Sequence, residues 1–489
     1  MKEKTKSKNS GNHPFAERKS LEKAMSLKDY ISLGLGTIVG IGWIIFAGIW
    51  LTRGGPLGAM LAFIIGGLLL ISVGKAFAEL APAIPVSGGG VAYSYKAFGT
   101  GPSFLTCWLY AFGYVFCCPY VIAALGWLFE FLFPALKSQP IYSVAGYPVG
   151  LSAIIPGLIT GAFIIGLNYL GIKSSARFQT ISTALMILCV IIIAIVALLK
   201  GSFSNLLPLF SKTGSIWAAP LSIIAVLGMV PWFMAGYDAI SQAAEESSKK
   251  MDPKHLGKAI IISIISAVIF YVATILALSL CMPWKEAITL EMPSAEVFRV
   301  AFGYEWTSKI VLLTGFLGLI TSLNGCFLGS TRLLFAGGRG GLIPNWFKEV
   351  DKKRHTPKNA IIFVGIITLS GSFLGRACFV PIVNVGALAF IGASFITCLA
   401  ALRLRKTSPD MKRPYKVKHK ATLYLGAGIS GLLVLLLIYP GSPAQLAWPL
   451  EYILIVLWLI IGYFGYRWRQ RKRDMSEEER NYQILGDYR

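Results

Sequence analysis

Glycine residues interrupt an apolar stretch near the N-terminus, and this stretch offers the first candidate chemistry. Leu33–Trp50 reads LGLGTIVGIGWIIFAGIW. A glycine inside a helix costs about 1 kcal/mol relative to alanine, so a helix is expected to open at Gly40-Ile41-Gly42. In hydrocarbon, the freed N–H and C=O groups persist only where protein or a polar cargo satisfies them. The sequence therefore predicts a binding site at a broken membrane helix.

A second apolar stretch, residues 215–243, carries GMVPWFMAGYD and is interrupted in its middle. Pro231 removes a backbone donor and clashes with the preceding helical turn, and Gly236 follows it. Asp238 lies just beyond, and an ionisable residue inside a membrane is expensive and marks a functional site by default. Three roles for its carboxylate remain open: capping the lower half-helix, bonding a neighbouring span, or taking a proton. For both interruptions the alternative is an ordinary kinked helix.

Composition places these stretches in a membrane protein. The chain has 489 residues, of which 55% are hydrophobic and 14% are charged, and its mean hydropathy is +0.65. A soluble protein of this length could not bury so much apolar surface, so the lipid bilayer is the expected surrounding. The net charge of +23 does not indicate nucleic acid. Its basic residues lie in short connections between apolar spans, where they set membrane topology.

Cysteine and histidine give no sign of an enzyme or a metal centre. The eight cysteines form no CxxC pair, and most lie in apolar spans, where we interpret them as small buried hydrophobic residues. All four histidines fall in polar connections. No HExxH motif is present, and no GxSxG motif with usable partners. The sequence predicts no enzymatic activity and no cofactor.

Twelve apolar spans are expected, each near or above the ~20 residues that a crossing helix requires. They cover residues 28–52, 57–81, 102–134, 148–171, 178–199, 215–243, 258–282, 306–336, 358–378, 380–403, 421–440 and 445–467. Residues 1–27 are expected to form a disordered cytoplasmic tail. Residues 468–489 are expected to form a cytoplasmic C-terminal tail, and for its charged part, Asp474–Arg489, solvation is favoured over association with the inner mouth of the protein.

Charge asymmetry gives the orientation. Lysine and arginine gather in alternate connections, on the same side as both tails, which places both termini in the cytoplasm of a plasma-membrane protein. The interrupted spans are the first and the sixth, and a repeat of five spans inverts its topology. Residues 28–200 and 215–406 are therefore predicted to be two inverted halves, followed by two helices within 420–467. The predicted fold class is an all-α polytopic membrane protein with twelve transmembrane helices, a five-plus-five inverted repeat and broken helices 1 and 6.

Five motifs in order resemble the amino acid–polyamine–organocation (APC) superfamily of secondary transporters. They are VGIG at Val39–Gly42, FAELAPAIPVSGGGVAYSY at Phe77–Tyr95, LNYLGIKSSARFQ at Leu167–Gln179, the aromatic–glycine–acidic run Trp232–Asp238, and NGCFLGSTRLLFAGGRGGLIP at Asn324–Pro344. The match extends from about residue 26 to residue 413. The resemblance implies a core of the leucine-transporter type and alternating access to a central amino acid site.

The resemblance also implies which residues bind the substrate. They are Ile38, Gly40, Ile41, Gly42 and Trp43 in span 1, with Trp232, Phe233, Ala235 and Gly236 in span 6. The free N–H groups of span 1 begin a half-helix whose positive end suits a carboxylate. Carbonyls of both spans would accept hydrogen bonds from the ammonium group, and the span-1 glycines let the ligand approach the backbone.

Three side chains near this site have further implied roles. Trp232 stands where the family often places an aromatic gate, with core packing as the alternative. Asp238 is a gating or proton-coupling candidate. Trp43 replaces the smaller aliphatic residue of many relatives and is expected to narrow the pocket. Span 3 offers no acid before Glu130, so a neutral amino acid is favoured over a polyamine or other organic amine, which would need several acids.

Ion coupling is open at this point. In proton-coupled relatives a lysine in span 5 faces the span-1 break, and Met186 stands at that position here. A sodium site is implied from the carbonyls of Gly36 and Val39 with the hydroxyls of Thr321 and Ser322, because hard oxygen ligands suit this cation. Hydroxyls in membrane helices also bond to their own backbone. Proton coupling and ion-free exchange are the other options.

The remaining charged residues are interpreted locally. Lys75 and Glu79 are four residues apart, which predicts a pair on one helix face or a lysine that reaches the membrane surface. Glu245 and Glu246 are interpreted as an inner-mouth feature or a solvated helix end. Subunit-facing and lipid-facing apolar surfaces look alike, so the sequence indicates no oligomeric state.

Overall fold

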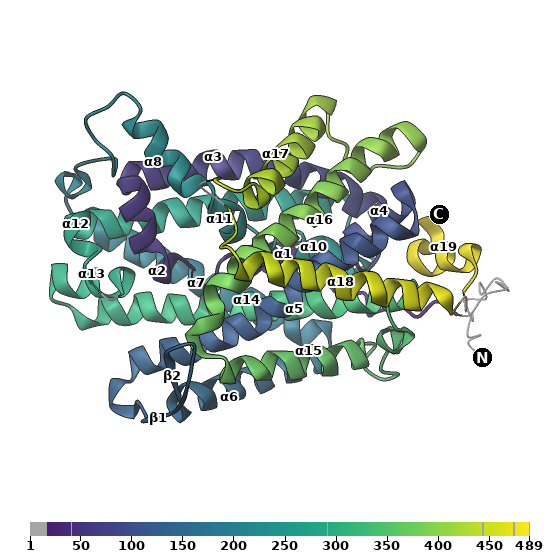
Figure 1. Cartoon of the computed structure of the whole chain (residues 1–489), viewed down its shortest axis with the longest axis horizontal. Coiled ribbons are helices and arrows are strands. Elements are labelled where there is room, and N and C mark those ends of the chain that lie inside the picture. Colours follow the sequence, from purple (N-terminus) through teal and green to yellow (C-terminus); the bar gives the residue numbers. More distant parts are fainter. Residues whose placement is uncertain (1–16, 41, 291, 443–444, 473–474, 489) are drawn as a thin grey trace, which may run out of the picture.

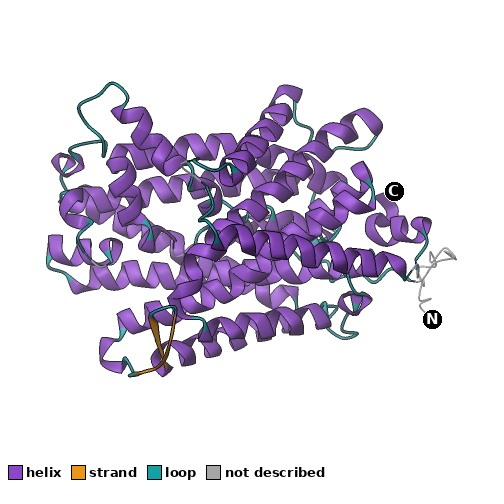
Figure 2. Cartoon of the chain, viewed as in Figure 1, coloured by secondary structure: helices purple, strands orange, loops and turns teal. Residues whose placement is uncertain are grey.

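The computed structural model of the chain describes residues 17–40, 42–290, 292–442, 445–472 and 475–488, and the side chains of residues 377 and 378 are not described. Ile41 of the expected substrate site and the side chain of Cys378 therefore lie outside the description. Figure 1 shows long helices that run side by side along one axis, and Figure 2 shows that helix dominates throughout. The first half holds α1 (Leu27–Ile38), α2 (Gly42–Ile45), α3 (Ala47–Ala83), α4 (Gly90–Phe98), α5 (Thr100–Leu132), α6 (Leu151–Leu170) and α7 (Ile172–Lys200).

The second half and the tail continue the bundle. Its helices are α8 (Ala218–Leu227), α9 (Val230–Phe233), α10 (Ala239–Gln242), α11 (Lys254–Cys281), α12 (Trp284–Ala287), α13 (Pro293–Phe302), α14 (Glu305–Arg339), α15 (Lys358–Ser370), α16 (Phe379–Thr407), α17 (Lys420–Ile438), α18 (Leu450–Arg471) and α19 (Glu477–Leu485). Short 3₁₀ helices lie at Pro134–Leu136, Phe203–Leu206, Ala244–Glu246, Asn345–Lys348, Gly371–Phe373, Gly375–Cys378 and Gly486–Tyr488.

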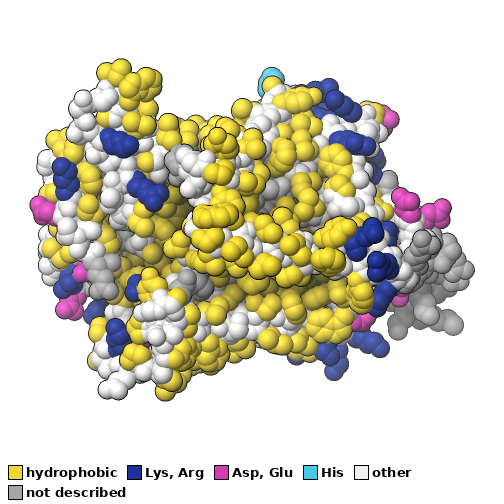
Figure 3. Space-filling view, in the orientation of Figure 1, with side chains coloured by type: hydrophobic (Ala, Val, Ile, Leu, Met, Phe, Trp, Pro, Cys, Tyr) yellow, Lys and Arg dark blue, Asp and Glu magenta, His cyan; other side chains and the backbone are white. Residues whose placement is uncertain are grey.

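The described residues support an all-α polytopic membrane protein. Ten helical segments among them are long and apolar enough to cross a membrane, and two shorter apolar ones, Ala218–Leu227 and Lys358–Phe373, fall within expected spans. Figure 3 shows apolar side chains in a broad band between two ends, and lysine and arginine gather at those ends. This is the pattern of a surface that meets lipid along its sides and water at its ends.

One element departs from the all-α expectation. Strands β1 (Pro140–Val144) and β2 (Tyr147–Gly150) form an antiparallel hairpin between α5 and α6. Ala145 and Gly146 both have positive φ, 47° and 84°, which matches a two-residue hairpin turn. The expected span over residues 148–171 is wrong at its start, because its first residues form strand β2 and the helix begins at Leu151.

Both tails are ordered where they are described. In the N-terminal tail, Leu21 and Met25 are buried, and the N–H of Met25 donates to the carbonyl of Glu246 at 2.9 Å. In the C-terminal tail, Ile484 and Leu485 of α19 are buried. The expected disorder is therefore wrong for residues 17–26, and the expected solvation is wrong for residues 483–486, which are buried.

The two tails also meet. The Nε of Arg18 donates to the carbonyl of Gln483 at 3.2 Å, and the Nζ of Lys96, at the end of α4, donates to the carbonyl of Tyr488 at 2.6 Å. Figure 1 places α19 at one end of the bundle. The described parts of both tails therefore cover the same end of the helix bundle.

Candidate functional site

Both predicted interruptions are present, and they face each other. Helix α1 ends at Ile38 and α2 begins at Gly42, while α9 ends at Phe233 and α10 begins at Ala239. Gly236 lies in the second interruption with φ +118°, and a Cβ built on it would lie 3.0 Å from the backbone N of Ile38. The two broken backbones are therefore in direct contact.

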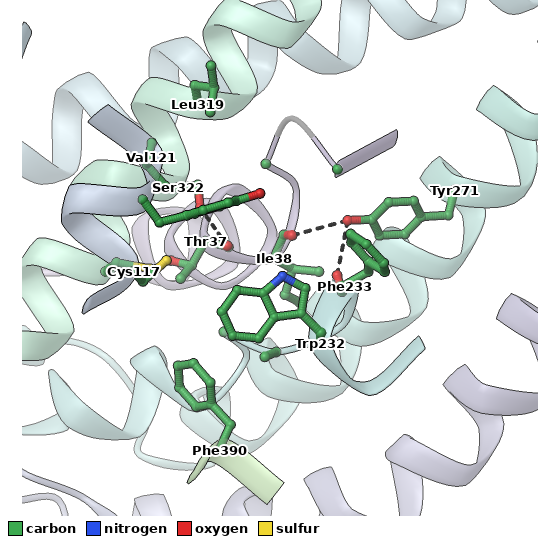
Figure 4. A pocket seen from close by; sticks show the side chains of 16 residues that line it. Thr37, Ile38, Cys117, Val121, Trp232, Phe233, Tyr271, Leu319, Ser322 and Phe390 are labelled. Atoms are coloured by element: carbon green, nitrogen blue, oxygen red, sulfur yellow. Dashed lines mark hydrogen bonds between the residues drawn. The ribbon is translucent and has the colours of Figure 1, made fainter. Parts of the chain in front are cut away.

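A cavity of about 50 Å³ lies between the interruptions and the neighbouring helices (Figure 4). It is lined by Thr37, Ile38, Gly40, Gly42, Cys117, Tyr120, Val121, Trp232, Phe233, Ala235, Gly236, Tyr271, Leu319, Ser322, Cys326 and Phe390. None of these described lining residues carries a charge. A water molecule needs about 10–15 Å³ of cavity volume measured in this way, so the cavity has room for only a few and must widen to admit an amino acid.

Two neighbouring aromatic residues of α9 point to different sides. The indole of Trp232 lies beside the cavity, with ring centroids 6.2 Å from Phe390 and 6.3 Å from Tyr120. The ring of Phe233 packs instead against Phe46 and Trp50, at 5.1 and 4.9 Å. Both residues line the cavity, and the gate role of Trp232 stays a prediction.

Tyr271 of α11 joins the two interruptions and was missed by the sequence reasoning. Its hydroxyl lies 3.3 Å from the carbonyl of Ile38 and 3.0 Å from the carbonyl of Phe233, one from each broken helix (Figure 4). Both carbonyls are among those expected to accept from an ammonium group. Nothing in the sequence around a tyrosine within a plain apolar span distinguishes it from core packing.

Replacing Tyr271 with phenylalanine is expected to destabilise the protein by about 1–3 kcal/mol, because two buried carbonyls lose their donor. The same change at Tyr463, which is exposed on the outside of α18, is the matched control and is expected to leave stability unchanged. Thermal unfolding of the purified variants in detergent measures both. Equal unfolding temperatures for the two variants would show that the Tyr271 hydroxyl does not hold the interruptions together.

Comparison with known proteins gives the family. The amino acid permease family model matches residues 25–461. The branched-chain amino acid permease BcaP of Bacillus subtilis is 29% identical over 471 residues, covering 93% of this chain and 94% of the relative. The methylthioribose transporter of the same species is 26% identical, and the match covers 94% of this chain and 96% of that transporter. The cationic amino acid transporter 6 of Arabidopsis thaliana is 26% identical, and the match covers 86% of this chain and 72% of that transporter.

The chain belongs to the amino acid permease family. The resemblance to the APC superfamily is confirmed, and with it the expectations of a multi-pass membrane protein that transports amino acids and is not an enzyme.

In this permease, Trp43 does not narrow the cavity. Its side chain is 3% exposed, lies outside the cavity lining, and packs edge-on against Phe270 with centroids 5.9 Å apart. Its carbonyl accepts from the hydroxyl of Ser294 at 2.9 Å. The expected loss of pocket space is therefore wrong, because the indole turns toward α11.

Gly42 and Gly40 differ in how tightly they are enclosed. A Cβ on Gly42 would lie 2.5 Å from the ring of Phe233, whereas a Cβ on Gly40 would have the hydroxyl of Ser322 as its nearest neighbour, at 3.5 Å. The backbone of Gly42 thus closely approaches the second interruption. Ala235 and Gly236 complete the lining from that side.

The sodium candidates come together, but their hydroxyls have protein partners. The Oγ1 of Thr321 donates to carbonyls of its own helix, Leu317 at 2.9 Å and Gly318 at 3.0 Å. The Oγ of Ser322 donates to the carbonyl of Thr37 at 3.3 Å. A Cβ on Gly36 would lie 3.0 Å from the Cβ of Thr321. The hydroxyl of Thr321 therefore bonds to the backbone of its own helix, which is the alternative to sodium binding given above.

A buried amide occupies the same junction and was also missed. The Nε2 of Gln179 donates to the carbonyl of Thr321 at 3.2 Å and to that of Ser32 at 3.3 Å. Its Oε1 accepts from the Nδ2 of Asn324 at 2.8 Å, and this fixes which way the amide faces. Asn324 in turn accepts from Asn168 at 2.8 Å. This chain of amides ties spans 1, 4, 5 and 8 together.

Asp238 is buried and lies outside the central cavity. Its side chain makes no capping hydrogen bond to α10, so that one of its three candidate roles is wrong. A smaller cavity beside it is lined also by Tyr237 and Ser394. Bonding to a neighbouring span and proton transfer remain as its roles.

Glu245 and Glu246, which follow the second interruption, form two buried ion pairs with α14. The carboxylate of Glu246 pairs in bidentate fashion with Arg332 at 3.0 and 2.8 Å, and that of Glu245 pairs with Arg339 at 2.9 and 2.8 Å. Arg18 lies 3.4 Å from Glu245. The solvated alternative is therefore wrong, and the inner-mouth interpretation stays a prediction.

The charge of Glu245 is fixed by its partners. This residue follows the apolar span 215–243. Burial raises the pKa of its carboxyl, but Arg339 and Arg18 outweigh burial and lower the pKa to about 2. The N–H of Ser87, in the Ser-Gly-Gly motif after span 2, donates to the same carboxylate at 2.9 Å. Glu245 therefore stays ionised at neutral pH and joins spans 2, 6 and 8 with the N-terminal tail.

Glu79 has different partners from the one expected. Its buried carboxylate bonds to Arg405 and accepts from the N–H of Val417 at 2.9 Å, while Arg413 lies 3.3 Å away. The expected pairing with Lys75 on one helix face is wrong. The bonds instead fasten the connection after α16 to the C-terminal part of α3.

Proposed function

We propose that this permease is a secondary transporter that moves a neutral amino acid across the plasma membrane by alternating access. The observation that carries this proposal is the cavity between the two interruptions, where backbone groups of both broken helices meet and no described lining residue is charged. A lysine or arginine side chain, or a polyamine, would need a buried acid at this point. The apolar and sulfur-containing lining instead suits an apolar side chain.

The backbone supplies the groups for the common part of an amino acid. The N–H groups of Gly42 and Trp43, at the start of α2, would suit the carboxylate, and Ile41, which lies outside the described residues, is proposed to add its own N–H. The carbonyls of Ile38 and Phe233, which now share the hydroxyl of Tyr271, would accept from the ammonium group when the cavity widens. Trp232 would close over the substrate, and its position beside the cavity supports that role.

We extend the proposal to the architecture. Residues 28–200 and 215–406 would form the inverted five-helix halves of a twelve-span protein, with helices in 420–467 outside this core and cytoplasmic tails at 1–27 and 468–489. Contact between the described parts of both tails supports their location on one side of the membrane. The interruptions in the first and sixth spans support the pairing of the halves.

Two ion-coupling schemes belong to the proposal. Sodium would be held by the carbonyls of Gly36 and Val39 with the hydroxyls of Thr321 and Ser322, which would have to give up their present bonds. A proton would be carried by Asp238, the buried acid beside the second interruption. The self-bonded state of Thr321 favours the proton scheme over the sodium scheme.

Ligand-induced thermal stabilisation of the purified permease tests the proposal, because a ligand that binds the folded state raises its unfolding temperature. We expect leucine or another neutral amino acid to raise that temperature, and lysine and putrescine to leave it unchanged. Gly42→Leu is expected to lose the shift, whereas Gly166→Ala, which meets no neighbour within 4 Å, keeps it. A shift with putrescine alone would make the protein an organic amine transporter, and a shift that requires sodium would favour the sodium scheme.

A further inference from the structure

Two thiols from different helices meet at the wall of the cavity. Cys117 of α5 and Cys326 of α14 both line it, and the Sγ of Cys326 donates to the Sγ of Cys117 at 3.1 Å. Figure 4 shows Cys117 beside Thr37, on the side of the cavity away from Tyr271. Both side chains are buried, with exposures of 7% and 3%. Contact with solvent therefore requires that the cavity open.

This arrangement differs from that of the other described cysteines. The Sγ of Cys118 donates to the carbonyl of Tyr114 at 3.5 Å, and that of Cys281 donates to the carbonyl of Ala277 at 3.1 Å. These are bonds within one helix, as expected for a cysteine used as a small buried side chain. Among the described hydrogen bonds, only Cys117 and Cys326 bring two thiols together.

We propose that Cys117 and Cys326 form a redox-sensitive dithiol site in the wall of the transport cavity, and that its oxidation by a peroxide blocks transport. One sulfur, as the thiolate, attacks an oxygen of hydrogen peroxide, breaks the O–O bond and becomes a sulfenic acid, and the other oxygen leaves as water. The second thiol displaces the sulfenic oxygen as water. Two thiols thus lose two protons and two electrons, and one peroxide becomes two water molecules.

The geometry favours this reaction over a reaction at a single cysteine. The second thiol already contacts the first, so it is in place to resolve the sulfenic acid as soon as that acid forms. A disulfide has an S–S bond of about 2.05 Å, so the sulfurs must approach by only about 1 Å. The new bond would link α5 to α14 beside Ser322 and remove both thiol hydrogens from the cavity.

The first experiment detects the bond without any substrate. A protease site is inserted in the exposed connection at residues 212–216, which separates Cys117 from Cys326 after cleavage. The full-length protein is treated with hydrogen peroxide in membranes, cleaved, and run on a denaturing gel without reductant. We expect the two fragments to stay joined and to separate with dithiothreitol. The same treatment of Cys118→Ser should give joined fragments, and that of Cys117→Ser or Cys326→Ser should give separate ones.

The second experiment measures transport and rests on the proposed function. Uptake of the amino acid identified by thermal stabilisation is compared before and after peroxide within each variant. After peroxide, we expect the unmodified protein and Cys118→Ser to lose most of their uptake and to regain it with dithiothreitol. For Cys117→Ser and Cys326→Ser, we expect the uptake after peroxide to equal the uptake of the same variant before peroxide. Separate fragments in the unmodified protein, joined fragments in Cys117→Ser, or undiminished uptake in a protein whose fragments are joined would each overturn the proposal. Because the gel needs no substrate, a wrong substrate assignment cannot imitate a failed cross-link.

Discussion

Replacing Arg332 with methionine is expected to destabilise the permease by about 3–5 kcal/mol, the range for removing one partner of a buried ion pair. Arg332 and Glu246 are both about 1% exposed in their side chains, and they share two charge-assisted hydrogen bonds. Without the guanidinium, the carboxylate of Glu246 would remain buried with its charge uncompensated. Its side chain is only about 1% exposed, so solvent at the surface does not reach the carboxylate.

A control variant at an exposed ion pair and a double variant that removes both partners make this prediction specific. Lys309→Met removes a lysine from a pair with Glu305 whose side chains are 74% and 80% exposed, and it is expected to leave stability unchanged. The double variant Arg332→Met/Glu246→Leu is expected to recover most of the loss, because an apolar pair of similar size often replaces a buried ion pair at little cost. Denaturant titration in detergent micelles measures the free energies of unfolding for a double-mutant cycle. A double variant no more stable than Arg332→Met would contradict the explanation by uncompensated charge.

The interruptions were the part of the site that local sequence could predict. Glycine at residues 40 and 42, and proline with glycine in residues 231–236, weaken a helix through their own backbone chemistry, whatever surrounds them. The helices end at these places. The candidate substrate residues from both interruptions then meet at one cavity, apart from Trp43 and the undescribed Ile41.

Partners that are distant in the sequence could not be predicted in the same way. Glu79 illustrates this, because the nearby Lys75 satisfied the four-residue rule, yet the carboxylate bonds to Arg405 across the fold. Tyr271 and Gln179 have no motif, since their roles depend on which carbonyls the folded chain brings to them. The hairpin was missed for a different reason. Residues 148–150 directly precede an apolar helix, so the sequence assigns them to its start, whereas the turn at Ala145-Gly146 places them in strand β2.

Gly236→Ala is expected to weaken binding of the transported amino acid by about ten- to a hundredfold. Its φ of +118° is one that residues with a Cβ rarely adopt, and the new Cβ would lie 2.8 Å from the Cγ2 of Thr37 and 3.0 Å from the N of Ile38. Backbone strain of this kind costs about 1–3 kcal/mol, and about 1.4 kcal/mol corresponds to a tenfold change in affinity. The collision forces the two interruptions apart where the substrate would contact both.

Gly99→Ala is the matched control for the backbone strain alone. Gly99 has φ +83°, but a Cβ built on it meets nothing within 4 Å, and the residue lies between α4 and α5, away from the cavity lining. We expect this variant to lose stability by a similar amount while keeping the affinity of the unmodified protein. Affinities from titration calorimetry and unfolding temperatures separate the two effects. Equal affinities for Gly236→Ala and the unmodified protein would contradict the prediction. They would show that the backbone strain does not move the groups that bind the substrate, and that substrate binding does not depend on contact between the broken helices.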